Sequence, residues 1–545
     1  MQMNHAVCNK VIYGLYAALL MLLGLTAQAA ETSRVYVGFA PGQKAAVAAS
    51  LSRAGGQTHY TFDRLDAFAV SVPTVALKGL SNNPNILYIE DDPKRYLMAE
   101  SVPYGIAMVQ ANVAPQPSSP TERAVCIVDS GYSLGHEDLP PTPIVSGTND
   151  AGTGNWYTDE NHHGTHVAGT IAALANNTGV VGVLPNSNIN LHIVKVFDAA
   201  GWAYSSSLVA AVQKCADAGA DVVSMSLGGS FKSRTEDRAF KDFDSLGMLS
   251  IAAAGNDGNT RMSYPASYSS VVSVAAIDGQ KVVADFSQKN SQVELAAPGV
   301  AVRSTVPPGT GMDESVTVGS TGYEAIALEA SFQGSATGAL VDCGIGDAPC
   351  AGAGGKVCLI ARGTITFAEK VVACQNGGGI AAIIANNAPG LFSGTVSGTV
   401  TSIPSVGVSQ ASGTALGGQL GTSAKVTVQP GNYAYFDGTS MATPHVSGVA
   451  ALVWAANPGG CTNADIRAAL TDTAEDLGVP GRDDSYGYGL VQAAAAITSL
   501  SCGGGSGGGG GGGTCTLGAV GDACTSNSDC CSSNCKGKPG NKVCK

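Results

Sequence analysis

The chain has 545 residues, enough for three or more domains, and carries 29 basic against 41 acidic side chains, a formal charge of −12. The acidic balance, without a basic run or interleaved basic and aromatic residues, argues against a nucleic-acid partner.

Residues 1–29 are predicted to be a secretory signal peptide. A short basic start ends at Lys10, an apolar run follows, and Ala27-Gln28-Ala29 has the small-residue pattern of a cleavage site. The apolar run is too short for a membrane span, and no second long run follows. We therefore expect a secreted, extracellular protein without a membrane anchor.

Residues 30–98 are expected to form a small α+β domain. Strand-like segments at 34–39, 67–72 and 86–92 accompany a helix-like segment at 45–56 that ends in glycine. An ordinary surface domain is the alternative to the more specific interpretation given below.

From about residue 99 to residue 500, strand-like and helix-like segments alternate, which predicts a parallel sheet covered by helices. The expected strands are 124–129, 189–197, 221–227, 249–255 and 271–278. The expected helices are 163–175, 205–218, 234–246, 441–456 and 462–472. Asp129 and Asn256 each follow a strand, where active sites of such sheets lie.

Ser440 belongs to a Gly-Thr-Ser turn that precedes the apolar stretch 441–456. The apolar spacing predicts a helix, and we expect Pro444 in its first turn, where a missing N–H costs nothing. A serine there is often only an N-cap. It becomes a nucleophile only when another group removes its proton.

Two upstream segments supply such partners. Asp129 ends a strand and is followed by Ser-Gly, and His163 opens His-Gly-Thr-His-Val-Ala-Gly-Thr. The order Asp, His, Ser along the chain is that of the subtilisin triad, not of chymotrypsin or the α/β-hydrolases. Together, the blocks DSG, HGTHVAGT and GTSMATPHVSG resemble the catalytic blocks of the subtilisin family of serine proteases.

The resemblance implies a subtilisin-like three-layer α/β fold and an endopeptidase that hydrolyses proteins or peptides through an acyl-enzyme. Ser440 would be the nucleophile and His163, rather than His162, the general base. Asp129 would orient the imidazole. The block Ala-Ala-Ala-Gly-Asn-Asp-Gly resembles the one with the oxyanion-hole asparagine, here Asn256, with a simple turn asparagine as the alternative.

The resemblance also implies a substrate groove between segments 226–229 and 252–255, onto which an extended peptide would add as β-structure. Small side chains there, with Ser263 at the pocket floor, imply a preference for large apolar P1 residues. Asp257 near the rim leaves basic P1 residues open. The expected substrate-binding residues are Ser226, Leu227, Gly228, Ala253, Gly255 and Ser263.

Segment 174–183 directly follows the His163 helix and resembles the family's calcium loop. Oxygen donors of this kind suit Ca²⁺, and a polar surface loop is the alternative. The implied ligands of a structural Ca²⁺ are Glu100, Asp138, the Asn176 side chain and the carbonyl groups of Leu174, Thr178 and Val180.

By the same resemblance, residues 30–98 would be an inhibitory propeptide, an intramolecular inhibitor removed by self-processing after Met98. The catalytic domain would comprise 99–310 and 431–502. The intervening residues 311–430, about 120 in number, are too many for a loop. They resemble the protease-associated domain inserted in some subtilisins, a cap or exosite, with a passive spacer as the alternative.

Residues 503–514 are predicted to be a glycine-rich linker, and 515–545 a cysteine-rich module whose spacing resembles knottins. Its lysines suit an anionic surface or polymer, and an inert protective tail is the alternative. The knottin resemblance implies the disulfides 515–531, 524–535 and 530–544.

The other cysteines, apart from Cys8 of the signal peptide, are even in number, as expected in an oxidising compartment. Cys461 and Cys502 are expected to pair, and Cys126 and Cys215 either pair or remain buried thiols. Four cysteines of the insertion could form two local disulfides: 343, 350, 358 and 374.

A protein of a different class would be a catalytically silent scaffold that displays the insertion and the cysteine-rich module. The intact set of Asp129, His163, Ser440 and Asn256 argues against it.

Overall fold

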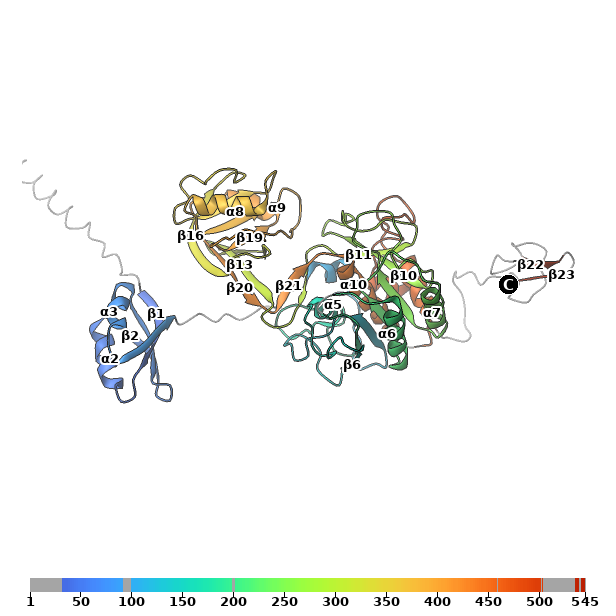
Figure 1. Ribbon diagram of the computed structural model, residues 1–545, viewed down its shortest axis with the longest axis horizontal. Coiled ribbons are helices and arrows are strands. Elements are labelled where there is room, and N and C mark those ends of the chain that lie inside the picture. Colours follow the sequence, from blue (N-terminus) through green and yellow to red (C-terminus); the bar gives the residue numbers. More distant parts are fainter. Residues whose placement is uncertain are drawn as a thin grey trace, which may run out of the picture. The chain divides into compact units, whose positions relative to one another are not determined.

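The structure is a computed structural model, and it divides into two compact units, Met1–Leu97 and Met98–Lys545 (Figure 1). The described residues are 32–91, 100–198, 201–457, 459–500, 502, 535–538 and 541–544. The predicted signal peptide, the processing junction after Met98 and the glycine-rich linker lie outside them. None of the helices in these ranges is long and apolar enough to cross a membrane.

The first unit is an antiparallel sheet with two short helices, α2 (Lys44–Arg53) and α3 (Leu77–Ser81). Its strand order is β2 (Gln57–Phe62), β3 (Ala67–Pro73), β1 (Thr32–Phe39) and β4 (Ile86–Asp91). Val47 and Leu51 of α2 pack on the apolar face of the sheet. The strands and the helix expected in this region are present, and β2 is an additional strand.

The second unit contains a seven-stranded sheet in which every neighbouring pair is parallel. Its strand order is β11 (Val293–Pro298), β10 (Val271–Ile277), β9 (Leu249–Ala253), β8 (Val222–Met225), β5 (Ala124–Asp129), β7 (Asn190–Lys195) and β6 (Val145–Asn149). The order reverses direction at β5, which lies between β7 and β8. A crevice opens at such a switch point, beyond the carboxyl ends of the strands.

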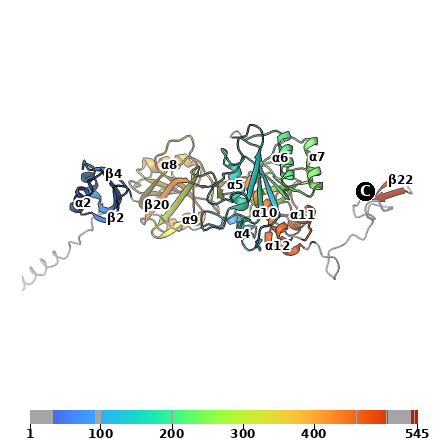
Figure 2. The same cartoon turned by 90° about the horizontal axis from the view of Figure 1, so that it is seen from below.

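Helices cover both faces of this sheet (Figure 2). On one face, α6 (Ser205–Asp217) and α7 (Arg234–Ser245) pack on alternate strand residues such as Val223 and Met225. On the other face, residues such as Val222 and Ile251 pack against five other helices of the same fold. These are α4 (Tyr104–Met108), α5 (His163–Ala172), α10 (Thr439–Ala456), α11 (Asn463–Asp472) and α12 (Ala493–Ser499).

Three layers form because the central strands are largely apolar and buried on both faces, so that successive residues pack into opposite hydrophobic cores. The α/β fold with a parallel sheet, predicted from the sequence, is confirmed, and all five expected helices form within a few residues of their predicted bounds. The position of Pro444 was predicted wrongly: α10 begins at Thr439, so Pro444 lies inside the helix.

A second sheet, of eight strands, lies between Gly311 and Gly431 and interrupts the first fold. β12 (Val302–Thr305) and β21 (Tyr433–Phe436) pair just outside it. Its strand order is β14 (Thr321–Tyr323), β13 (Gly311–Val318), β20 (Ser423–Gly431), β16 (Gly334–Asp342), β17 (Val357–Ala361), β18 (Ala381–Ala385), β19 (Ser405–Val408) and β15 (Ala325–Ala327). Residues 311–431 are called the insertion below.

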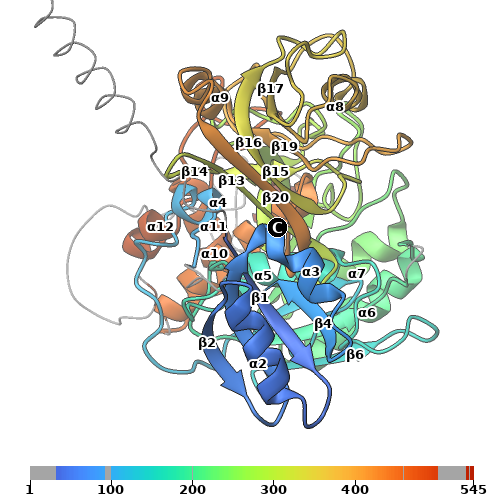
Figure 3. The ribbon, with the colours of Figure 1, turned by 90° about the vertical axis from the view of Figure 1, so that its left-hand side faces the viewer.

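Two helices cover opposite faces of the insertion sheet, α8 (Phe367–Asn376) and α9 (Gln410–Gly417), on either side of β17 in Figure 3. Leu416 of α9 packs on one set of alternate strand residues and Val371 of α8 on the other. The insertion therefore has its own pair of hydrophobic cores. Its ends meet, because Gly311 pairs directly with Gly431.

The structure forms four disulfides among its described residues: Cys126–Cys215, Cys343–Cys350, Cys358–Cys374 and Cys461–Cys502. Of the two alternatives for Cys126 and Cys215, the paired one holds, and the bridge ties β5 to α6. Strands β22 (Cys535–Lys538) and β23 (Asn541–Cys544) pair antiparallel in the C-terminal module. The three knottin-type disulfides predicted there lie outside what the structure describes.

Candidate active site

Asp129 and His163 come from two adjoining elements. Asp129 is the last residue of β5 and is fully buried, and His163 is the first residue of α5. The Nδ1 atom of His163 lies 2.8 Å from Oδ1 of Asp129, which also accepts a 2.7 Å hydrogen bond from the Ser130 N–H. The second ring nitrogen, Nε2, is thereby left for another partner.

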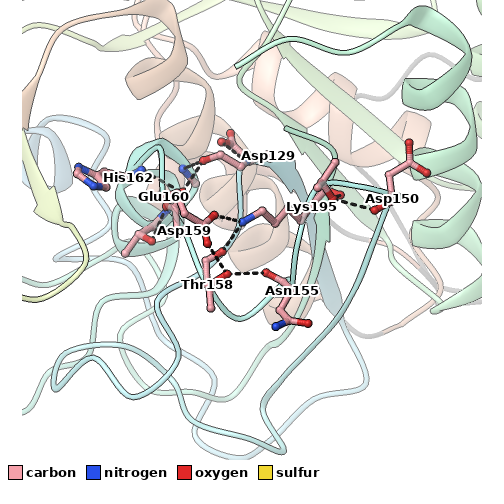
Figure 4. A network of polar contacts seen from close by, with 12 residues as sticks. Asp129, Asp150, Asn155, Thr158, Asp159, Glu160, His162 and Lys195 are labelled. Atoms are coloured by element: carbon pink, nitrogen blue, oxygen red, sulfur yellow. Dashed lines mark hydrogen bonds and ion pairs between the residues drawn. The ribbon is translucent and has the colours of Figure 1, made fainter. Parts of the chain in front are cut away.

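A buried polar network holds this pair in place (Figure 4). Asp159 accepts hydrogen bonds from the N–H and hydroxyl of Thr165 in the first turn of α5, at 2.8 and 2.6 Å. It also accepts from the Ser130 hydroxyl at 2.8 Å, and that hydroxyl accepts from the Gly164 N–H. Asp159 thus acts as a cap for α5 and joins it to the strand end that carries Asp129.

The same network includes a buried lysine. Lys195, at the end of β7, is fully buried and donates to the Thr158 carbonyl at 2.9 Å and to the Glu160 carboxylate. A buried ammonium group must be paired in this way, because its desolvation is costly. Lys195 therefore fixes the loop that presents Asp159.

Electrostatics favour the protonated form of His163. Burial lowers its pKa, but the charge and hydrogen bond of Asp129, and the charge of Asp159, act against burial and hold the pKa above its ordinary value. His166, one turn along α5, is buried against backbone carbonyl groups and stacks on Phe436, and burial lowers its pKa to about 3. His166 is therefore a neutral packing residue.

His162 lies just before α5 with a left-handed backbone (φ 73°), and its N–H donates to Asp159 at 3.0 Å. Its place in the structure is that of a turn residue. Of the two adjacent histidines, it is His163 that bonds Asp129.

Ser440 occupies the first turn of α10, and its hydroxyl donates to the Ser226 carbonyl at 3.0 Å. Pro444 has no N–H to offer the carbonyl group four residues earlier, which is that of Ser440. The Ser226 hydroxyl donates to this carbonyl instead, at 2.7 Å. Ser226 therefore holds the start of α10 at both the backbone and the side chain of Ser440.

Asn256 follows β9 and is oriented by Thr439. Its Oδ1 accepts from the Thr439 N–H at 2.9 Å and from the Thr439 hydroxyl at 2.8 Å. The Thr439 hydroxyl also accepts from the Gly255 N–H. With its oxygen engaged in this way, the side-chain NH₂ of Asn256 has no hydrogen-bond partner among the described residues, and Asn256 lines the same two pockets as Ser440.

Two pockets meet at Ser440 and Asn256. The first, of about 270 Å³, includes five of the six predicted groove residues, namely Leu227, Gly228, Ala253, Gly255 and Ser263, together with Asp257. The sixth, Ser226, lines an adjoining pocket that contains His163. A Cβ on Gly228 would come within 2.5 Å of the Ser263 hydroxyl, so this glycine keeps the floor of the pocket open.

The second pocket, of about 610 Å³, lies on the other side of Ser440. The catalytic fold contributes His163, Asn256, Ser440, Met441 and the segment 435–437. The insertion contributes Glu329 and residues 393–395. Residues far apart in the sequence therefore share one wall of the site.

The loop after α5 brings most predicted calcium ligands together. Buried Asp138 accepts from the Asn176 amide at 3.2 Å and from the Val180 N–H at 2.9 Å, and Glu100 accepts from the Asn176 N–H at 2.7 Å. Burial, with the nearby charges of Glu100 and Glu137, raises the pKa of Asp138 to about 7. A bound cation would relieve that repulsion.

The carbonyl groups predicted to complete this site are also available. In the described part of the chain, the carbonyl oxygens of Leu174, Thr178 and Val180 accept none of the hydrogen bonds found. The residues present therefore fit a Ca²⁺ ion, which prefers carboxylate and carbonyl oxygen.

Sequence reasoning missed several residues that shape the site: Ser130, Asp159, Lys195, Glu329 and Thr439. Thr439 adjoins the nucleophile, so its hydroxyl could have been suspected. Asp159 and Lys195 gave no local signal, because their roles depend on segments brought together only by the fold. Glu329 lies in the insertion, and the sequence does not show that this residue lines a pocket with Ser440.

This constellation, at the switch point of a parallel sheet, defines a serine hydrolase of the Asp-His-Ser type. The family model described as "Subtilase family" matches residues 121–334 and 371–489. Subtilisin amylosacchariticus from Bacillus subtilis subsp. amylosacchariticus is 36% identical over 269 residues, which are 48% of this chain and 68% of that protein. Subtilisin DY from Bacillus licheniformis is 40% identical over 217 residues, 39% of this chain and 77% of that protein.

A solved structure is also similar: the psychrophilic subtilisin-like protease Apa1 from the Antarctic psychrotroph Pseudoalteromonas sp. AS-11. It superposes with a TM-score of 0.68 at 46% identity and covers 73% of this chain and 98% of its own. The chain belongs to the subtilase family. It is a serine endopeptidase, and the prediction of a subtilisin-like enzyme is confirmed.

Proposed function

We propose that Ser440, His163 and Asp129 form the catalytic triad, with Asn256 and the Ser440 N–H as oxyanion donors. The hydrogen bond between Asp129 and His163 carries this proposal, because it fixes the tautomer that leaves Nε2 free to act as a base. Ser440 and His163 line the same pocket, and Asn256 presents its NH₂ beside them. A catalytically silent scaffold would not require these residues to lie together in this geometry.

In the proposed reaction, the Ser440 Oγ turns from the Ser226 carbonyl and attacks the scissile carbonyl carbon. Its proton passes to Nε2 of His163, which returns it to the leaving amine as the peptide bond breaks. The acyl-enzyme formed is then hydrolysed by water along the same proton path. The Asp129 carboxylate stabilises the imidazolium at each step, in accord with the raised pKa of His163.

Substitution of Ser440 by Ala tests the triad. We expect essentially all cleavage of casein and of a four-residue chromogenic peptide to be lost, while the melting temperature stays close to that of the wild type. A serine-reactive phosphonate should label the wild type and not the variant. Cleavage by the purified variant would show that another residue is the nucleophile.

The pocket of about 270 Å³ that Gly228 and Ser263 line would receive the acyl part of the substrate and is called the acyl-side pocket below. It favours large apolar P1 residues. Its floor is open because Gly228 has no side chain, and Ser263 is polar but uncharged. Asp257 lies in the same pocket and is exposed, so a basic P1 residue is the second choice. Cleavage profiling with a peptide library that varies only P1 shows whether large apolar or basic P1 residues are cleaved faster.

The enzyme is proposed to be secreted as a zymogen. The separate compact unit of residues 32–91 has the size and α+β character expected of an inhibitory propeptide, and the disulfides of the second unit suit an extracellular protein. In a protease-free host, Ser440→Ala should accumulate with its propeptide attached. Normal maturation of that variant would refute self-processing at Met98.

The loop after α5 is proposed to hold a structural Ca²⁺ ion through Glu100, Asp138 and Asn176, with the carbonyl groups of Leu174, Thr178 and Val180. Such an ion binds only the folded state and stabilises it by mass action. Chelation should lower the melting temperature before it affects turnover. Asp138→Asn should reproduce part of that loss, whereas Asp242→Asn, which removes an exposed carboxylate of α7, should not.

The insertion is proposed to be a protease-associated domain that acts as a cap or exosite for protein substrates, because it forms part of the wall beside Ser440. The C-terminal module is proposed to bind an anionic surface or polymer through its lysines. Binding of the full chain to anionic and neutral polysaccharide beads, compared with a chain ending at Cys502, tests the latter.

A further inference from the structure

The pocket on the leaving-group side of Ser440 carries an acidic wall that comes from the insertion. A substrate bound for attack by Ser440 spans both pockets, because the nucleophile lies where they meet. The acyl part occupies the pocket of Gly228 and Ser263. The residues after the scissile bond therefore enter the pocket of about 610 Å³ that Glu329 lines.

Glu329 is held in place by its backbone. Its N–H donates to the Gly394 carbonyl at 2.8 Å, and its carbonyl accepts from the Val396 N–H at 2.9 Å. The preceding residue, Leu328, is fully buried in a core of the insertion, and Ser331 is buried and bonded to Ser405. The carboxylate therefore projects from an ordered loop rather than from a free one.

The neighbouring segment is anchored in the same way. Phe392 and Val396 are buried in the insertion core, and Phe392 packs on Phe367 with ring centroids 5.2 Å apart. Ser393 and Thr395, between these anchors, are exposed and line the pocket. This alternation turns one edge of the segment toward the site and the other into the core.

Apart from His163, the charged side chains that line this pocket are acidic. Glu329 and Asp437 are exposed carboxylates, and Asp437 also accepts the Ala301 N–H at 2.6 Å. Among the described residues that line this pocket, none is a lysine or arginine. Within the same part of the chain, no hydrogen bond or ion pair is found for the Glu329 carboxylate. A cationic side chain of the substrate is the complement this wall lacks.

We infer that Glu329 gives this enzyme a preference for lysine or arginine at the first two substrate positions after the scissile bond. The inference rests on the proposed role of Ser440, since that role decides which pocket receives the leaving group. The insertion would thus select substrates by charge, in addition to any steric effect. Because the contact is exposed to solvent, the preference should be modest and sensitive to salt.

Two internally quenched peptides test this inference. They share the same acyl side, with Phe at P1, and carry either Lys or Gln at both positions after the scissile bond. The readout is the ratio of kcat/KM for the Lys peptide to that for the Gln peptide. For the wild type we expect a ratio of roughly three to five at an ionic strength of about 0.15 M, and a smaller one at about 1 M.

Glu329→Gln should lower the ratio, and Glu329→Lys should lower it further. Asp342→Asn is the matched control, because it removes an exposed carboxylate from the insertion that does not line this pocket but keeps an acceptor for the Gly344 N–H, and it should keep the wild-type ratio. Melting temperatures show whether each variant is folded. A wild-type ratio near one, or a ratio that Glu329→Gln leaves unchanged, overturns the inference.

The failure of the inference can be distinguished from failure of the proposed mechanism. If the wild type cleaves both peptides, Ser440→Ala cleaves neither, and the ratio is near one, the triad stands and the charge preference is wrong. If Ser440→Ala still cleaves the peptides, the assignment of the two pockets fails with it.

Discussion

The two pockets on either side of Ser440 are built in different ways. The acyl-side pocket is made of segments that follow β8 and β9, and its shape depends on missing side chains, as at Gly228 and Gly255. The leaving-group pocket takes part of its wall from two loops of the insertion, through Glu329 and residues 393–395. In the proposed function, the first would recognise the substrate backbone and the size of its side chain, and the second would present side-chain charge to the substrate.

This difference has a structural cause. The strands of the parallel sheet fix the acyl-side segments between the two hydrophobic cores on its faces, so little there can change without moving Ser440. The insertion has its own cores, and its ends are paired at Gly311 and Gly431. Its loops can therefore vary in sequence without disturbing the triad, which makes it the natural place for specificity to evolve.

The largest expected effect concerns the part of the site that both pockets share. Asn256→Ala should lower kcat by roughly 10²–10³, with little change in KM, because its NH₂ group donates mainly to the transition state. Steady-state kinetics on the four-residue chromogenic peptide and on a protein substrate should show the same factor. A raised KM with unchanged kcat would assign Asn256 to ground-state binding.

Thr439→Val should produce part of that effect without touching the substrate. It removes the hydroxyl that holds Asn256 Oδ1 at 2.8 Å but keeps the N–H bond. The loss in kcat should be smaller than that of Asn256→Ala, and the double variant should lose less than the product of the two factors. Independent, multiplicative losses would mean that Thr439 does not act through Asn256.

The residues proposed as triad and groove could be selected from the sequence because each lies in a contiguous block, at a strand end or a helix start. Asp129, His163, Ser440 and Asn256 are of this kind, and the structure brings all four to one place. Five of six predicted groove residues likewise line one pocket.

The sequence could not predict contacts between segments that meet only in the fold. Asp159 joins α5 to Ser130, and Ser226 supplies the donor that Pro444 withholds from Ser440. The expected place of this proline in the first turn was wrong, because α10 begins at Thr439 and the Ser226 hydroxyl supplies the donor that lets Pro444 lie inside the helix. The alternatives for Cys126 and Cys215 were also open, since pairing requires a distance and an orientation that only the fold sets.

The acyl-side pocket can be closed selectively. Gly228→Val places a side chain where even a Cβ would be 2.5 Å from the Ser263 hydroxyl, so peptides with Phe at P1 should lose on the order of tenfold or more in kcat/KM relative to those with Ala. Gly322→Val is the control, because Gly322 lies in β14, outside this pocket, and a Cβ there also meets open space. Equal losses for both variants would show that backbone strain, not pocket volume, decides the effect.

The dependence on pH tests the charges behind His163. Only the neutral imidazole can accept the Ser440 proton, so kcat/KM should fall about tenfold per pH unit below the pKa. Because the charges of Asp129 and Asp159 hold that pKa above its ordinary value of about 6.5, the fall should begin above this pH. The measurement is a pH profile of kcat/KM on the chromogenic peptide.

Asp159→Asn removes one of these charges while keeping an acceptor for Thr165, and it should move the acid limb of the profile to lower pH. Asp150→Asn, which removes a charge paired with Lys214, should leave the limb in place. An unshifted limb in Asp159→Asn would mean that Asp159 positions α5 without affecting the titration of His163.

The smallest effect on the chemistry itself should come from removal of the insertion. Replacing 311–430 by a short Gly-Ser linker is feasible because Gly311 and Gly431 are paired neighbours, and β12 and β21 still pair outside the cut. A four-residue chromogenic peptide occupies only the acyl side, so its kcat/KM should change little. A protein substrate extends past the scissile bond into the pocket that has lost Glu329 and residues 393–395, and its kcat/KM should change severalfold.

The comparison requires that the variant folds and matures, as shown by its melting temperature and its N-terminal sequence. An equal factor for both substrates would make the insertion a spacer or a stabilising element, and the contrast between the two pockets would then have no consequence for catalysis.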